Sequence, residues 1–241
     1  MITRILRGGL LGVVVAGVAY LVLLAYPQPL FAYEMTHAGL TVHADAPIPD
    51  TMRATLERVR ARLDRSPLDD RTRTPQIFIC NSPWRFAVFA RQNYRVAGVA
   101  DGFVGQHVFL RESDMSADRL IGPSGQTVAA DRPLSYFIAH EVMHIATVRH
   151  VGRRQYARMP QWVDDGYADY VARDIDMKAA LAQFKAGARE LDPARSGLYL
   201  RYHLMVAYLL DRRGLSITGL LANPPERDAL EQELHALTDW P

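Results

Sequence analysis

The chain has 241 residues, of which 49% are hydrophobic and 22% are charged, and its formal net charge at pH 7 is +2. This length suits one sizeable core, or a membrane segment followed by a domain of about 200 residues. The charge is nearly balanced and no basic run is interleaved with aromatic residues, which excludes nucleic acid as a main partner. The single cysteine, Cys80, lies in an apolar run and is expected to be buried and unreactive.

The amino terminus is predicted to be a membrane anchor. Arg4 and Arg7 precede an uncharged stretch, residues 8 to 26, which as a helix would be about 28 Å long, near the thickness of the hydrocarbon core. The next basic residue is Arg53, so residues 1 to 7 are expected in the cytoplasm and the rest of the chain outside it. A cleaved signal peptide is the alternative, and both interpretations export the domain.

The basic residues are almost all arginine, since only Lys178 and Lys185 are lysines. This bias is typical of a bacterial genome rich in G and C. Combined with the predicted anchor, it places the protein in the bacterial inner membrane with its domain on the periplasmic side. The membrane is therefore one expected partner.

The exported part is predicted to begin with a linker, residues 27 to 38, followed by one domain over residues 39 to 241. The first half of this domain mixes strands and helices. Strands are predicted at residues 39 to 44, 76 to 80 and 107 to 111, and helices at residues 50 to 65 and from residue 82 onward. Glycines 98, 102 and 105 interrupt the extended chain between residues 96 and 111.

From Pro133 onward the apolar residues recur with the period of a helix. Breaks are expected near Gly152, Pro160, Pro193, Gly214 and Pro224. A mixed first half followed by a helical second half predicts an α+β fold. In this fold a small sheet would stack on the helix of residues 133 to 151, and the helical half would close the domain.

The most informative motif, His140-Glu141-Val142-Met143-His144, lies on that helix. Residues four apart share one face of a helix, so both imidazole rings can reach one metal ion. Glu141 projects beside them, where it can take a proton from a metal-bound water, as the general base does in zinc-dependent peptide hydrolysis. The motif therefore predicts Zn²⁺ bound by His140 and His144, with Glu141 as the catalytic base.

A catalytic zinc usually takes three protein ligands and a water molecule, so a third ligand is expected. Residues 159 to 170 (MPQWVDDGYADY) resemble the Trp-x-x-Glu-Gly-x-Ala motif of the gluzincin metallopeptidases, the thermolysin-like and aminopeptidase N-like zincins. Trp162, Gly166 and Ala168 match this motif, and Asp165 stands where the family has its ligand glutamate. The resemblance implies a zincin-like metallopeptidase domain in which Asp165 is the third metal ligand.

Aspartate in place of glutamate departs from the gluzincin pattern. Its side chain is shorter by one C–C bond, about 1.5 Å, so the second helix must lie closer to the first or hold the metal more weakly. Aspartate is the third ligand in the aspzincin subgroup of zincins. Asp164 is the rival ligand, although it would point about 100° away around the helix. A site without an acidic ligand is the remaining alternative.

Two further residues take roles from the resemblance. Asp169, four residues after Asp165, would accept the second ring N–H of a zinc-binding histidine, as in the thermolysin-like pattern; a solvated surface aspartate is the alternative. Residues 199 to 209 (YLRYHLMVAYL) resemble the Tyr-x-Lys-Gly helix of aminopeptidase N-like enzymes, in which the tyrosine hydroxyl stabilises the oxyanion. Tyr199 takes that position, while Tyr202, His203 or a purely structural aromatic remain open.

In zincins the last strand before the metal helix lies at the sheet edge and can pair with extended peptide, so residues 104 to 111 are expected there. The resemblance implies an exported, membrane-anchored zinc metallopeptidase that acts on peptide or protein. A zincin-fold binding or assembly module without catalysis is the alternative. A structural domain with an accidental His-Glu-x-x-His is the third hypothesis.

Overall fold

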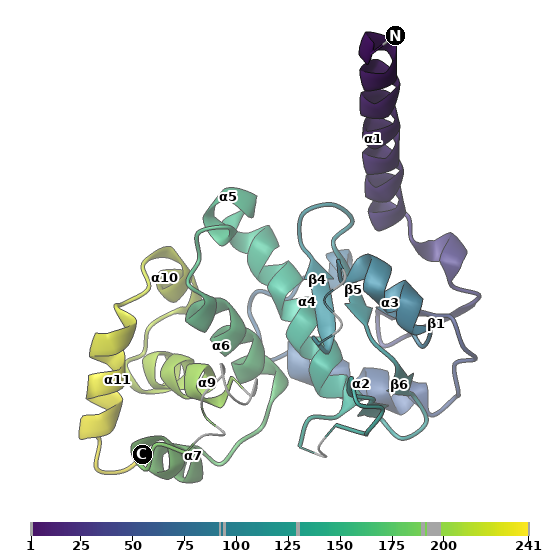
Figure 1. Ribbon diagram of the computed structural model, residues 1–241. Coiled ribbons are helices and arrows are strands. Elements are labelled where there is room, and N and C mark those ends of the chain that lie inside the picture. The colour runs from purple at the N-terminus through teal and green to yellow at the C-terminus, as the bar shows by residue number, and fades with distance from the viewer. Residues whose placement is uncertain are drawn as a thin grey trace.

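The computed structural model describes residues 2 to 240 except residues 92, 94, 129 to 130, 189 to 190 and 192 to 198. Of residues 2 to 10 it describes the backbone only. The fold is α+β, as predicted: a mixed sheet and its helices form one half of the domain, and helices alone form the other (Figure 1).

A five-stranded sheet has the spatial order β1-β2-β3-β5-β4. Its strands are β1 (Tyr33–His37), β2 (Leu40–Ala44), β3 (Ile77–Ile79), β4 (Gly98–Asp101) and β5 (His107–Leu110). β2, β3 and β5 are parallel to one another, and the two edge strands run antiparallel to their neighbours. Every residue of β3 and β5 is buried, which is expected of strands covered on both faces.

Alternate side chains of the central strands enter two separate cores. Ile77 and Val108 belong to the large core, which contains α2 (Met52–Leu63) and α4 (Leu134–Val151). Phe78 and Phe109 point to the other face and pack with α3 (Pro83–Phe89). Successive side chains of a strand point to opposite faces, so this separation follows from the period of two. Cys80 is buried in the second core, as predicted, and burial raises the pKa of its thiol.

The chain begins with α1 (Ile2–Ala25), whose carboxyl-terminal end rests on the second core (Figure 1). Leu24 is buried there, and the Tyr20 hydroxyl donates a hydrogen bond to the Val88 carbonyl at 2.8 Å. The predicted anchor, residues 8 to 26, overlaps this helix, and the side chains of residues 8 to 10 lie outside the description. Among the described residues, no helix is both long enough and apolar enough to cross a membrane.

The predicted linker, residues 27 to 38, contains structure of its own. It forms a short 3-10 helix, η1 (Gln28–Leu30), and the edge strand β1, so the folded unit begins before residue 39. No residue of β1 is fully buried, which explains why no apolar signal marked it as a strand.

The prediction that residues 104 to 111 form the sheet edge is wrong. β5 pairs with β3 on one side and with β4 on the other, so it has no free edge. The edge strand on this side of the sheet is β4, which precedes β5 in the chain and pairs with it as an antiparallel hairpin. The connection turns at Gln106, whose φ is 56°.

The remaining elements are a few short ones before α4 and the helices of the predicted helical half after it. Before α4 the chain forms η2 (Arg71–Arg73) and a small hairpin, β6 (Ser113–Asp114) and β7 (Arg119–Leu120). After α4 it forms α5 (Arg153–Tyr156), α6 (Gln161–Ala172), α7 (Met177–Lys185), α9 (Leu200–Ala207), the π-helix η4 (Tyr208–Arg212), α10 (Ile217–Ala222) and α11 (Arg227–Ala236). The break expected at Pro193 lies outside the described residues.

α6 packs against both α4 and α9, and a Cβ at Gly166 would lie 2.7 Å from the Tyr202 carbonyl oxygen. Glycine therefore permits the close contact of α6 with α9.

Asp45 is expected to stabilise the start of α3. Its side chain is 1% exposed and accepts hydrogen bonds from the backbone N–H groups of Asn81 and Ser82 and from Arg85, at 2.7 to 2.8 Å. Burial opposes ionisation, but these bonds outweigh it and lower the pKa of Asp45. Asp45→Ala should lower the free energy of unfolding at pH 7 by about 3 kcal/mol. The exposed Asp50→Ala is the control and should change it by less than about 0.5 kcal/mol.

The pH dependence of this effect has a definite sign. The depressed pKa means that the ionised Asp45 stabilises the folded state above the usual pKa of about 3.9. That stability is lost as the pH falls through the lower, folded-state pKa. Urea denaturation should therefore show the difference between wild type and Asp45→Ala shrinking below about pH 4, and a difference that grows on acidification would contradict the assignment.

Candidate metal centre

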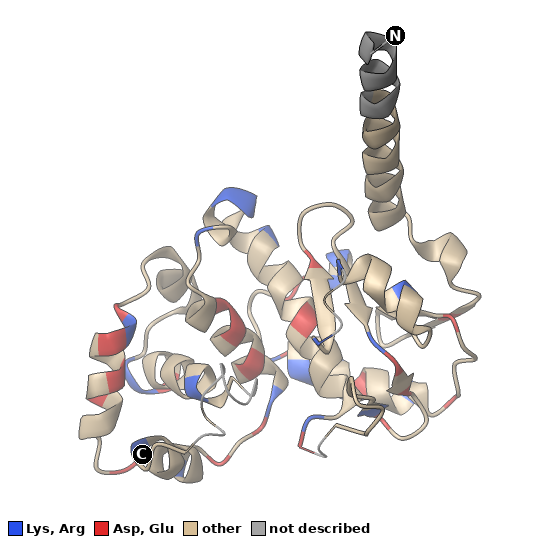
Figure 2. Cartoon of the chain, in the orientation of Figure 1, with Lys and Arg blue, Asp and Glu red and all other residues tan. Residues whose placement is uncertain are grey.

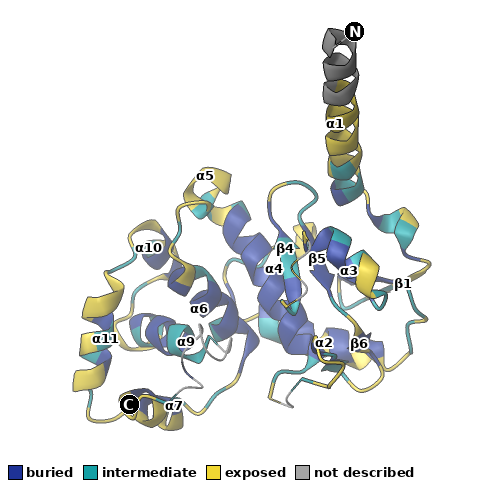
Figure 3. Ribbon diagram, in the orientation of Figure 1, coloured by how far each residue is buried: buried dark blue, intermediate teal, exposed yellow. Residues whose placement is uncertain are grey.

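α4 carries the His-Glu-x-x-His motif through the centre of the domain. Every residue from 134 to 148 is buried on this helix, which lies between the sheet and α6 (Figure 3). His140 and His144 lie one turn apart, with ring centroids separated by 4.8 Å. Both rings therefore face the helical half of the domain from one side of α4.

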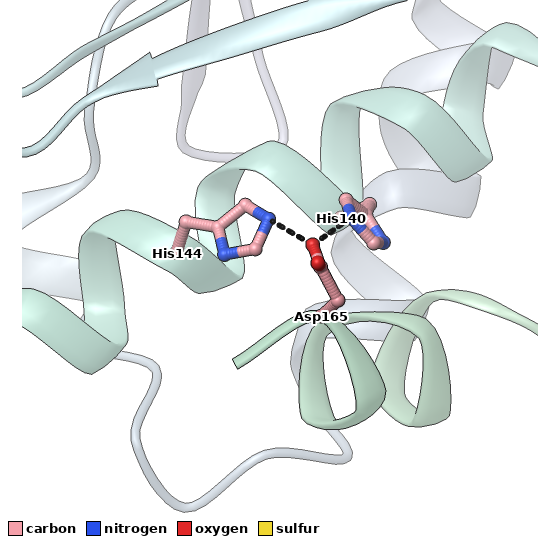
Figure 4. Close-up of side chains that lie close together, drawn as sticks. All are labelled: His140, His144 and Asp165. Carbon is pink, nitrogen blue, oxygen red and sulfur yellow. Dashed lines mark ion pairs between the residues drawn. The ribbon is translucent and has the colours of Figure 1, made fainter. Parts of the chain in front are cut away.

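Asp165 of α6 completes a three-residue group with these histidines. Its Oδ1 lies 3.8 Å from His140 Nε2 and 3.6 Å from His144 Nε2, and Figure 4 shows both rings directed at this carboxylate. One potential ligand atom from each residue lies within 4.8 Å of the other two. All three side chains are buried. The predicted third ligand is therefore next to the first two.

The distances from Asp165 Oδ1 to the two imidazoles suit a shared metal ion. The N–O distances exceed those of hydrogen bonds, whereas ligands around a tetrahedral zinc at 2.0 to 2.1 Å lie about 3.4 Å apart. Two imidazoles and a carboxylate also form a common donor set for catalytic zinc. The group of His140, His144 and Asp165 could thus hold a metal ion, and the shorter aspartate reaches the site because α6 packs directly on α4.

Asp164, the rival ligand, lies behind His144. Its Oδ2 is 3.0 Å from His144 Nδ1, the ring nitrogen that faces away from Asp165, and it accepts a hydrogen bond from the Tyr156 hydroxyl at 2.6 Å. Burial alone would lower the pKa of His144, but Asp164 and the other nearby carboxylates raise it to about 10. Asp164 is placed to orient His144 rather than to bind the metal with it.

Asp164→Asn is expected to weaken metal binding by about 10- to 100-fold, because the orienting charge behind His144 is lost. Competition with a chelator of known affinity measures this change. The matched control is Asp211→Asn, because Asp211 also accepts a tyrosine hydroxyl, that of Tyr170 at 2.7 Å, outside the metal centre. Equal metal affinities of the two variants would show that Asp164 has no orienting role.

Asp169 was predicted to contact a zinc-binding histidine. Its carboxylate is fully buried and accepts hydrogen bonds from the Tyr136 hydroxyl and from His203 Nδ1, the latter at 3.0 Å. Burial opposes its ionisation, but His203, His140 and the Arg173 guanidinium lower the pKa of Asp169. No described residue forms a hydrogen bond with His140 Nδ1. Asp169 thus fixes Tyr136, whose ring centroid lies 5.7 Å from that of His140.

Tyr199, the residue predicted to stabilise the oxyanion, lies beside the metal-binding group. It precedes α9 with a φ of 52°, and its ring stacks on His140 at a centroid distance of 5.9 Å. Burial raises the pKa of Tyr199 to about 12, with smaller contributions from Asp165 and Glu141. Its hydroxyl is therefore a hydrogen-bond donor at neutral pH. His203, an alternative for this role, is bound to Asp169 instead.

Glu141 lies where α4 meets the edge strand. Burial raises the pKa of Glu141, although His144 and His140 oppose the shift. A Cβ at Gly98 of β4 would lie 2.9 Å from Glu141 Cγ and 2.6 Å from Leu110 Cδ2. Only glycine lets β4 approach this closely, so Gly98 brings the free sheet edge to the predicted catalytic base.

A cleft of about 420 Å³ lies between the metal-binding group and the start of β4. Its lining includes the metal-binding group with Glu141 and Tyr199, the start of β4, and three arginines, at positions 95, 111 and 132. This volume lies in the range of small-molecule sites and holds a few residues of a peptide. Figure 2 shows that the acidic segments of α6 lie on the side facing α4.

Two tyrosines of this centre were not predicted. Tyr136 lies four residues before His140 on α4, so its place on the same helix face was available from the spacing. Tyr156 belongs to the short helix α5, and no spacing connects it to Asp164.

Comparisons with protein-family models, with curated proteins and with solved structures found no match. The function is therefore inferred from the residues and their geometry.

Proposed function

We propose that the protein is a zinc-dependent peptidase with a zincin-like fold. The observation that supports this most is the convergence of His140, His144 and Asp165 beside Glu141 in one cleft. The arrangement of the fold also supports it: the motif helix packs on a mixed sheet, an antiparallel edge strand borders the cleft, and the next long helix supplies the carboxylate.

The metal ion and two side chains have separate tasks in this proposal. Bound Zn²⁺ supplies Lewis acidity, which polarises the scissile carbonyl and acidifies a water molecule. Glu141 accepts the proton of that water and then donates it to the leaving amine; its raised pKa makes it a stronger base than an ordinary carboxylate. The protonated Tyr199 hydroxyl donates a hydrogen bond to the carbonyl oxygen as negative charge develops there.

The free edge of β4 is the proposed binding site for an extended peptide. The outward-facing backbone groups at its amino end can form further hydrogen bonds with a peptide strand, as in β-augmentation. Gly98 holds this edge against Glu141, so a peptide paired with β4 would pass the catalytic base. The substrate class is therefore a peptide or an unfolded segment of protein.

Hydrolysis of an unstructured protein by the purified full chain tests the proposal. We expect one zinc ion per chain, cleavage that stops when a chelator removes the metal, and recovery when zinc is added back. Cleavage that persists in the chelator would contradict it. Stoichiometric zinc without hydrolysis would instead support a binding or assembly module. Export of the domain remains a prediction from the charge asymmetry around residues 8 to 26, tested by fractionation of cells expressing the chain.

A further inference from the structure

The cleft contains a group of basic side chains that the proposed chemistry does not use. Arg95, Arg111 and Arg132 line it, while its acidic residues among those described are Glu141 and Asp165. Both of these carboxylates already have roles in the metal centre. Neither carboxylate is therefore available as the ion-pair partner of Arg132.

Arg132 has the clearest requirement for a ligand. It lies two residues before α4, and burial lowers the pKa of its guanidinium. Among the described residues none forms a hydrogen bond or an ion pair with it, and its Nε is buried without a partner. The neighbouring Asp131 is paired with Arg173, and Asp169 is bound to Tyr136 and His203. A desolvated guanidinium is costly unless a charge compensates it.

The other two arginines lie at the same end of the cleft. Arg111 follows β5, and its backbone N–H donates to the Ala97 carbonyl, next to the first residue of β4. Its guanidinium carbon lies 5.8 Å from the ring of Phe86 on α3, so its charged end packs against the second core and it is not counted as a ligand group. Arg95 is exposed and precedes Ala97 by two residues. Arg95 and the backbone of Arg111 therefore lie at the amino end of β4.

β4 and α4 run in the same direction across the cleft. Gly98, at the start of β4, lies against Glu141, whereas Gly102, just after β4, lies against Val148, seven residues further along α4. The amino end of β4 therefore coincides with the amino end of α4, where Arg132 lies. Arg95 and Arg132 therefore lie at the same end of the cleft, on the amino-terminal side of Glu141.

The direction of a bound peptide follows from this arrangement. An antiparallel ladder is slightly more stable per residue than a parallel one, and β4 already pairs in this way with β5. A peptide that is antiparallel to β4 would enter from the Val148 end and carry its carboxyl-terminal part to the arginines. Guanidinium groups bind carboxylates through paired, charge-assisted hydrogen bonds.

We infer that Arg95 and Arg132 form a subsite for a carboxylate on the carboxyl-terminal side of the scissile bond. This carboxylate is either the free end of a peptide or an acidic side chain close to the cleaved bond. The inference rests on the proposed function for the position of that bond, but binding of the carboxylate does not require hydrolysis.

Binding to the zinc-loaded full chain carrying Glu141→Gln tests the subsite without turnover. The probes are three labelled hexapeptide mixtures: one with a free carboxyl end and no acidic side chain, one amidated with glutamate near that end, and one amidated and neutral. Fluorescence anisotropy should show at least one carboxylate mixture binding about tenfold more tightly than the neutral one. The first two mixtures distinguish a chain terminus from an acidic side chain.

Arg132→Gln, added to Glu141→Gln, should remove this preference, whereas the exposed Arg153→Gln on α5 should leave it unchanged. Arg95→Gln should reduce the preference for the carboxylate mixtures about threefold. Because Arg95 is exposed, this variant tests the subsite even if Arg132→Gln fails to fold. Equal binding of all three mixtures would overturn the inference. A preference that survives both arginine replacements would come from the metal ion and would also overturn it.

The outcome is separable from that of the proposed function. The wild-type chain could hydrolyse amidated neutral peptides as fast as the others while Arg132→Gln leaves binding unchanged. That result would support the peptidase and reject the subsite. If the chain binds carboxylates in an arginine-dependent way but hydrolyses no peptide, the subsite is supported and the peptidase is rejected.

Discussion

Replacement of Glu141 by glutamine is expected to abolish hydrolysis and to leave the zinc content of the protein unchanged. Glutamine has nearly the same size as glutamate, but it cannot accept a proton from water. Loss of a general base typically costs 10²- to 10⁴-fold in rate, so kcat should fall by at least about a hundredfold. The zinc content should persist because the converging ligand atoms belong to His140, His144 and Asp165.

The matched control is Glu57→Gln, which changes an exposed glutamate of α2 that contacts His37. This variant should keep both its zinc and its turnover. Parallel measurements of cleavage rate and metal content distinguish the possible outcomes. Full turnover in Glu141→Gln would exclude the proposed base, and loss of zinc in that variant would make Glu141 a ligand instead.

The parts of the fold that were predicted correctly are those with a local signal. The metal helix, α2 and the buried strands β3 and β5 each have either a helical period or a short continuous apolar run. The two edge strands lack such a signal. No residue of β1 is fully buried, and β4 begins with a glycine that packing against Glu141 requires. The position of a strand in the sheet depends on pairing over long distances in the chain, which periodicity does not encode.

The candidate site shows the same division between local and tertiary information. His140 and His144 share a face because they are four residues apart, so their pairing follows from helical geometry alone. Asp165 was found only by its resemblance to a motif, because its reach depends on how α6 packs on α4. Asp169 shares a helix face with Asp165, but its partners are set by Tyr136 and by His203 on α9. No spacing within one helix identifies a partner on another.

Asp165→Ala and His144→Ala are each expected to remove stoichiometric zinc from the protein. Each substitution leaves two protein ligands where catalytic zinc requires three, and the affinity should fall by about a thousandfold or more. Metal analysis after dialysis and chelator competition measure this loss. The exposed Asp174→Ala, just beyond α6, is the control and should bind zinc as the wild type does.

Asp165→Glu tests whether the spacing of the two helices is matched to aspartate. The Asp165 carboxylate already lies 3.6 to 3.8 Å from both Nε2 atoms, so a side chain about 1.5 Å longer would overreach the site. We expect Asp165→Glu to bind zinc more tightly than Asp165→Ala and more weakly than the wild type. If Asp165→Ala kept wild-type affinity, no acidic ligand would complete the site. Tighter binding by Asp165→Glu than by the wild type would show instead that aspartate falls short, and that α6 can move to accommodate the longer ligand.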